Sequence, residues 1–208
     1  MIKPRRYVSS VFNQFAIEVK RLKTFDEENQ SKFADGSLRK KQLYMLCESL
    51  FFNGFREYEN FIRDVFLLYS QGKPRTNGKS VNSFLKPKNF HHAERMIQSS
   101  MNFLDWNSPE SIIERSELYL NNGYPVKTPY TLNKAALNQY KKLRNQIAHN
   151  SSSSIAGYQK ILRLHFGTVP LTTPSVGEYL CLTSKKDNTK YHLLEFFELI
   201  EQMANQIK

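Results

Sequence analysis

Hydrophobic positions recur at steps of three and four residues along much of this 208-residue chain, which is the pattern of amphipathic helices. The longest such run predicts one helix over residues 37–69, since no proline interrupts it before Pro74. A shorter run predicts a helix over residues 7–23. Gly54 lies inside the long helix, where glycine costs about 1 kcal/mol relative to alanine. We therefore expect close packing against another helix at Gly54.

Four more helices follow from the same periodicity, over residues 89–103, 109–121, 131–148 and 191–206. Ser108 and Pro109 are suited to the N-cap and first turn of the helix over 109–121. The helix over 191–206 places apolar residues on one face, namely Leu194, Phe197, Ile200 (or Leu199), Met203 and Ala204.

The stretch 150–190 is irregular and less periodic. The four serines from Ser151 form a loop or a cap, YQKILRLHF is ambiguous between strand and helix, and KKDNT resembles a turn. VGEYLCLTS alternates as a short strand does. The sequence thus predicts an all-α fold, a helical bundle with a minor short β or extended segment late in the chain, in a single domain over 1–208.

Composition is that of an ordinary folded protein, with 40% hydrophobic and 24% charged residues. The N-terminal MIKPRRYVSSVFNQF has no continuous apolar run and does not resemble a secretory signal. No stretch has the length needed to span a bilayer. We expect a cytoplasmic protein with no membrane partner.

The charge balance points to a polyanionic partner. Thirty Lys and Arg against nineteen Asp and Glu give a net charge of +11, and a basic field attracts nucleic acid. A basic loop over residues 71–88 supplies the best candidates for RNA backbone contact, namely Lys73, Arg75, Lys79, Lys86 and Lys88. The cluster Arg39, Lys40 and Lys41 comes second. The alternative for each is a solvated basic surface that aids solubility.

The remaining cysteines and histidines predict no further site. Cys47 and Cys181 lie in apolar sequence and are expected to be buried thiols, not a disulfide framework or a zinc site. His91 and His92 are adjacent and point in different directions on a helix. His165 and His192 are isolated in the sequence. We expect no metal and no cofactor.

One stretch carries candidate chemistry, the segment KKLRNQIAHNSSSS that begins at Lys141. The predicted core stripe of its helix is formed by Ala136, Tyr140, Leu143 and Ile147. Counted from the start of the stripe, Arg144, Asn145 and His149 lie at about 80°, 180° and 220°. Asn145 and His149 should therefore lie close together, and Arg144 is long enough to reach the same surface. The alternative is an ordinary helix end with Asn150 as its stop, and chance alone yields Arg-x4-His in roughly a quarter of such chains.

The fuller string RNQIAHN follows an aromatic-rich helix containing FREYENFIRDVF, and together they resemble the HEPN family of all-α ribonuclease domains. Arg144, Asn145 and His149 occupy the positions of that family's arginine, polar residue and histidine. The nearest variety resembles the HEPN proteins of bacterial defence and toxin systems, in which a segment similar to VGEYLCLTSKKD leads into the final helix.

The resemblance implies a metal-independent endoribonuclease that uses the 2′-OH of its RNA substrate as nucleophile. His149 would be general acid or base, and Arg144 would stabilise charge on the phosphate. Asn145 would orient the imidazole or hold substrate, with Lys141 and Lys142 on flanking phosphates. The resemblance also implies a homodimer with a composite site, and an antitoxin or defence-system partner.

Two features depart from the family pattern or stay open. Ser151 stands where partner-regulated HEPN toxins carry a tyrosine, and Glu48 or Glu59 is either a polar helper or a solvated helix edge. The main rival interpretation is a non-catalytic HEPN-like module that binds RNA or a protein. A helical domain with a chance motif is the remaining alternative.

Overall fold

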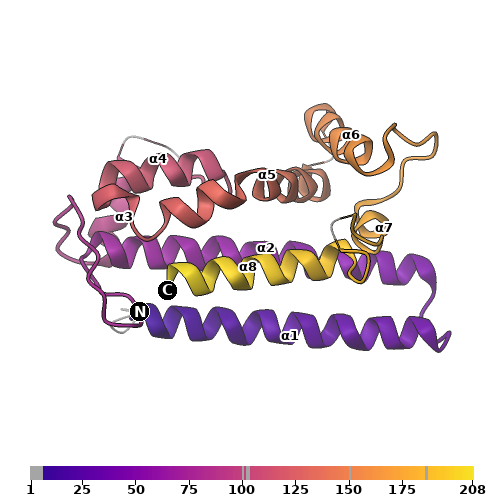
Figure 1. Ribbon diagram of the computed structural model, residues 1–208, viewed down its shortest axis with the longest axis horizontal. Helices are drawn as coiled ribbons and strands as arrows, with labels where there is room; N and C mark the ends of the chain where they lie inside the picture. Colours follow the sequence, from indigo (N-terminus) through magenta and orange to yellow (C-terminus); the bar gives the residue numbers. More distant parts are fainter. Residues whose placement is uncertain (1–6, 100, 102–103, 150, 186) are drawn as a thin grey trace. The chain divides into compact units, whose positions relative to one another are not determined.

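A computed structural model of the chain describes residues 7–99, 101, 104–149, 151–185 and 187–208 (Figure 1). Within these residues it contains eight α-helices and one short 3-10 helix, and no β-strand. The elements are α1 (Val8–Ala34), α2 (Lys40–Ser70), α3 (Phe90–Gln98), α4 (Pro109–Tyr119), η1 (Asn121–Gly123), α5 (Lys127–His149), α6 (Ser152–Phe166), α7 (Val176–Leu180) and α8 (His192–Ile207). The predicted all-α class is confirmed.

The late strand was the wrong prediction. VGEYLCLTS contains helix α7, which begins after Ser175, whose side chain accepts a hydrogen bond from the backbone N–H of Glu178. The extended character that remains near this segment is an isolated bridge between Thr183 and Tyr191. Alternation over so few residues does not distinguish a strand from one helical turn, and the N-cap serine decided the outcome.

Most helix boundaries agree with the periodic pattern. The structure gives α2, α4 and α8 bounds close to the predicted 37–69, 109–121 and 191–206. Helix α3 ends at Gln98, while Phe103, where we expected its end, lies outside the described residues. The ambiguous YQKILRLHF is helical, because Ser151 and Ser154 form a capping box that starts α6. Asn150, the expected stop of the preceding helix, also lies outside the described residues.

Helix α1 is longer than its apolar run predicts. Its buried face continues from Val19 to Asp26 and Asn29, both 2% exposed. The three-and-four spacing is therefore kept, but its last members are polar. The Tyr191 hydroxyl donates to the Asp26 carboxylate, which is how this polar residue is satisfied inside the protein.

Helix α5 starts at Lys127, earlier than the predicted residue 131. Of its predicted core stripe, Leu143 is buried, and the other three residues are half-buried. Leu137, outside that stripe, is buried as well. The α8 face is likewise broader than predicted, with Leu193 and Phe196 buried and Leu194 half-buried.

The chain divides into two compact units. The first comprises Met1–Ile17, Glu57–Leu137 and Glu201–Lys208. Its core is aromatic: the rings of Phe15 and Phe61 lie 4.8 Å apart, and those of Phe66 and Trp106 lie 5.4 Å apart. Ring pairs at these separations add to the stabilisation from apolar burial. The single-domain assignment stays a prediction.

The second unit comprises Glu18–Arg56 and Asn138–Ile200. Phe196 of α8 is central to it, with ring centres 4.6 Å from Phe51 and 5.0 Å from Tyr140. A Cβ atom at Gly54 would lie 2.8 Å from the ring of Phe197, which is too close for any non-glycine residue without a shift. The predicted close helix packing at Gly54 is confirmed.

The two cysteines belong to this second unit. Cys47 is buried as predicted, whereas Cys181 is half-buried, and their sulfur atoms lie 3.2 Å apart as free thiols. Among the described helices, none is both long and apolar enough to cross a membrane.

Candidate active site

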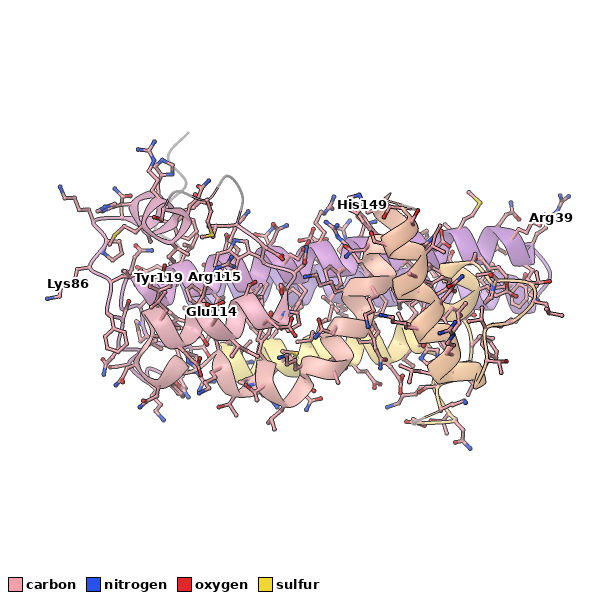
Figure 2. All side chains as sticks on the ribbon, turned by 90° about the horizontal axis from the view of Figure 1, so that it is seen from above. Arg39, Lys86, Glu114, Arg115, Tyr119 and His149 are labelled. Carbon is pink, nitrogen blue, oxygen red and sulfur yellow. The ribbon has the colours of Figure 1, made fainter. Side chains whose placement is uncertain are left out.

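The last turns of α5 bring the predicted arginine and histidine together. Nη1 of Arg144 lies 3.5 Å from Nε2 of His149. His149 is exposed at the end of the helix, as Figure 2 shows, and Arg144 is half-buried. The helical wheel separates these residues widely, so the contact depends on the length of the arginine side chain. The pair thus presents a cation and an imidazole to solvent at one place.

An aromatic ring of another helix supports the arginine. The guanidinium carbon of Arg144 lies 5.7 Å from the ring centre of Phe52 on α2. Guanidinium groups are attracted to aromatic faces, and such contacts restrict the rotamers of the long side chain. Phe52 therefore fixes where Arg144 can present its charge. The contact of Phe52 with Arg144 could not be predicted from the sequence, because no spacing rule connects the two residues.

Asn145 contacts the arginine and not the histidine. Nη1 of Arg144 donates to Oδ1 of Asn145 at 3.5 Å, and the structure gives Asn145 and His149 no hydrogen bond to each other. Arg144 therefore lies between the two, bridging them through one nitrogen. This arrangement supports a role for Asn145 in holding Arg144 or the substrate, more than in orienting the imidazole.

Two lysines of α5 precede the pair. Lys141 and Lys142 are both half-buried. The stem of Lys142 runs beside α6, since a Cβ at Gly157 would lie 3.5 Å from its Cγ atom. Long lysine stems commonly cover apolar surface while the ammonium stays in water. Both lysines precede Arg144 on the same helix and add positive charge to this part of α5.

The basic loop belongs to the first unit, and its arginine is engaged within the fold. Arg75 donates from Nε to the carbonyl of Lys208 at 2.7 Å and from Nη2 to the carbonyl of Gln206 at 2.7 Å. Its Nη1 donates to the hydroxyl of Tyr124 at 2.8 Å. Terminal carbonyls of a helix need such partners, so Arg75 caps the C-terminal end of α8. That role competes with the predicted RNA contact.

The loop lysines differ in their surroundings. The ammonium of Lys79 lies 4.8 Å from the ring centre of Tyr124. Lys86 and Lys88 are exposed, and Lys73 is half-buried. In Figure 2 the Lys86 side chain extends away from the ribbon. Lys86 and Lys88 are the loop residues best placed to meet a polyanion from solvent.

Glu48 has a structural partner. Its Oε1 accepts the backbone N–H of Gly177 at 2.8 Å, which attaches the N-terminal end of α7 to α2. It is therefore neither a free helper for His149 nor a solvated helix edge. Glu59 belongs to the other unit and is half-buried.

His165 and His192 are isolated in the sequence, but the fold brings them together. Nδ1 of His165 lies 3.2 Å from Nε2 of His192, although 26 residues separate them in the chain (positions 166 to 191). Burial and the charge of Lys185 lower the pKa of His165. The sequence spacing does not predict the pair, because α6 and α8 bring the two histidines together only in the folded unit.

Comparisons of the chain with protein-family models, with curated proteins and with solved structures find no match. The resemblance of RNQIAHN to the HEPN motif stays a prediction.

Proposed function

We propose that the protein is a metal-independent endoribonuclease of the HEPN type that cuts RNA at the exposed end of α5. The observation that supports this most is the 3.5 Å approach of Arg144 to His149 on a solvent-facing surface. A mobile proton carrier beside a fixed cation is the minimum that RNA cleavage by its own 2′-OH requires. The net charge of +11 supports a polyanionic substrate.

The chemistry assigns one role to each group. His149 removes the proton from the 2′-OH, and the 2′-oxygen attacks the adjacent phosphorus. The bond from phosphorus to the 5′-oxygen breaks, and that oxygen takes a proton. The products are a 2′,3′-cyclic phosphate and a 5′-hydroxyl. Arg144 balances the charge that builds up on the phosphate oxygens, for which its planar fork is well shaped.

A second copy of the chain completes the site in this proposal. Cleavage needs both a base and an acid, whereas each chain supplies one His149 at its Arg144. In a homodimer, two Arg144–His149 pairs would face one phosphate. Lys141 and Lys142 would then bind the flanking phosphates, and Lys86 and Lys88 would contribute to longer-range attraction of RNA. A role in toxin–antitoxin or anti-phage defence, with an antitoxin or defence-system partner, belongs to the same proposal.

The test is RNA cleavage by the full chain in the presence of EDTA. Total RNA and transfer RNA are incubated with wild type, Arg144→Ala and His149→Ala, and the product ends are identified. We expect cyclic phosphate ends from wild type and their loss in both variants. Light scattering on the same preparations measures the predicted dimer.

Matched controls separate the site from general charge loss. Arg21→Ala removes an exposed arginine of α1 that pairs with Glu18, and His91→Ala removes an exposed histidine of α3. Both should cleave like wild type. Equal cleavage by His149→Ala and wild type would refute the proposal. No cleavage by any protein, with equal RNA binding by all of them, would favour the non-catalytic binding module.

A further inference from the structure

Two histidines of the second unit face each other at a place distinct from the Arg144–His149 pair. His165 lies in the last turn of α6, and His192 is the first residue of α8. Their facing nitrogens are 3.2 Å apart, and their ring centres are 5.1 Å apart with planes inclined at 70°. The side chain of His192 is 12% exposed, and His165 is half-buried.

The distances fit a shared metal ion as well as a bent hydrogen bond, and they do not fit an in-line hydrogen bond. Two imidazole nitrogens bound about 2.05 Å from a tetrahedral zinc ion lie about 3.3 Å apart, with ring centres about 5.2 Å apart. An in-line hydrogen bond with the observed nitrogen separation would place the ring centres about 5.5 Å apart. The observed ring separation of 5.1 Å matches the first arrangement. The lines from each ring centre to its facing nitrogen are therefore not collinear. Coordination of one metal ion by both nitrogens requires such an angle between them.

The surroundings of His192 are those of a metal ligand. Oε2 of Glu195 lies 3.4 Å from its Nδ1, while the hydroxyl of Ser184 donates to Oε1 of the same carboxylate at 2.6 Å. A carboxylate behind one imidazole nitrogen fixes the tautomer, so that the lone pair of the other nitrogen faces the metal. Glu195 would thus direct Nε2 of His192 towards the space shared with His165.

Tyr179 of α7 holds both rings. Its ring stacks on His192 at 4.4 Å with an angle of 10° and meets His165 edge-on at 5.5 Å. The two imidazoles are therefore oriented before any ion arrives. A preformed pair avoids part of the ordering cost that binding otherwise carries.

We propose that His165 and His192 bind a divalent transition-metal ion of the zinc class, with Glu195 as the outer partner of His192. Imidazole nitrogen suits such ions, whereas Mg²⁺ and Ca²⁺ prefer oxygen ligands. Among the described residues, no group of three or more His, Cys, Asp or Glu side chains is placed to hold a metal. Water would complete the coordination shell of the ion. The ion would join the end of α6 to the start of α8.

This inference goes beyond RNA cleavage and does not depend on it. The first test uses the wild-type full chain, freed of metal with a chelator, and follows its histidine ring signals by NMR during titration with Zn²⁺. We expect the signals of His165 and His192 to change together at one ion per chain, and those of His91 and His149 to stay. Mg²⁺ at the same concentration should change none of them.

Calorimetric titration of variants with Zn²⁺ gives the second test. Glu195→Gln should weaken binding by about 10- to 100-fold, as removal of an outer carboxylate usually does. His165→Ala and His192→Ala should weaken it at least as much, while His149→Ala and His91→Ala should bind like wild type. Circular dichroism confirms that each variant is folded, and the NMR titration does not depend on any variant.

Two results would overturn the proposal. If the ring signals of His165 and His192 do not change when Zn²⁺ is added, the two residues interact only through a hydrogen bond. Undiminished zinc affinity in folded His165→Ala and His192→Ala would place the ion elsewhere. Loss of RNA cleavage in His149→Ala bears on the proposed nuclease alone, so the two proposals fail separately.

Discussion

The second unit presents histidine in two contrasting settings. His149 is exposed at the end of α5, with Arg144 beside it and Lys141 and Lys142 earlier on the same helix. His192 is largely enclosed, with Glu195 behind one ring nitrogen and His165 before the other. His149 thus has a guanidinium as its neighbour, whereas His192 has a carboxylate.

The surroundings of a histidine, and not the residue type alone, determine what it can do. A cationic, open setting attracts phosphate and leaves the imidazole accessible to a substrate hydroxyl. An enclosed setting backed by a carboxylate directs a nitrogen lone pair at a cation.

We expect the greatest change in RNA cleavage from substitution of His149, and almost none from substitution of His165. His149→Ala should lower the RNA cleavage rate by about 10²- to 10⁴-fold, the usual contribution of a general acid or base. His165→Ala should change that rate by less than about threefold, since effects of independent sites are separable. Initial rates on one defined RNA measure both. A large loss of cleavage in folded His165→Ala would contradict the separation.

A second effect, on stability, concerns the packing of α7, whose Tyr179 contacts His165 and His192. A Cβ atom at Gly177 would lie 2.0 Å from the backbone oxygen of Tyr44, so Gly177→Ala must push α7 away from α2. We expect a loss of about 3 kcal/mol or more in the free energy of unfolding. Gly54→Ala would bring its methyl group 2.8 Å from the ring of Phe197 and 3.1 Å from the ring of Phe196, with no backbone atom as close, and should cost less. Urea unfolding monitored by circular dichroism measures both.

Gly157→Ala is the matched control for these glycine variants. Its added methyl group would lie 3.5 Å from Lys142, an ordinary contact, inside helix α6. Alanine favours helix over glycine by up to about 1 kcal/mol, so this variant should be as stable as wild type or more so. Equal destabilisation by Gly157→Ala and Gly177→Ala would show that close packing of α7 is not the cause.

A smaller effect tests the aromatic support of the exposed pair. Phe52→Ala removes the ring beneath Arg144, a contact that contributes about 0.5 to 1 kcal/mol when exposed. The cleavage rate should fall by about two- to fivefold. Phe52→Trp, which keeps an aromatic face, should retain most of the rate. A loss as large as that of Arg144→Ala would mean that Phe52 does more than hold the guanidinium.

The smallest effect is the pH dependence of stability from the pair of His165 and His192. Burial and the charge of Lys185 lower the pKa of His165 below its ordinary value of 6.5, so the unfolded chain binds the proton more readily. Stability should therefore fall as the pH drops below about 6.5. The groups facing His165 are His192, Tyr179 and Phe166, and Lys185 acts on it through its charge.

His165→Gln should reduce that acid-side loss, because glutamine does not titrate. Urea midpoints at pH 7.5, 6.0 and 5.0 measure the slopes of wild type and variant. Metal must be removed from both samples, since a bound ion would itself compete with protons. Parallel slopes for the two proteins would assign the pH dependence to other groups, such as His192.

Much of the fold can be predicted from the periodicity of hydrophobic residues. The places where this prediction fails have physical reasons. The apolar runs of α2 and α8 are long enough that only a helix buries them. The end of α1 was missed because its buried positions there are Asp26 and Asn29, which a hydrophobic pattern cannot register. Helix α7 in VGEYLCLTS has only five residues, which is too short for a helical period to be distinguished from strand alternation.

The all-α class and the positions of Arg144 and His149 on one helix could be predicted from the sequence, because both depend on neighbours a few residues apart. Close packing at Gly54 could be predicted from the cost of a glycine inside a long helix, but its partner Phe197 could not. The contacts of Phe52 with Arg144, of Arg75 with the end of α8 and of His165 with His192 follow only from the folded structure. They join residues from different parts of the chain, and packing within each unit fixes them, which no local spacing encodes.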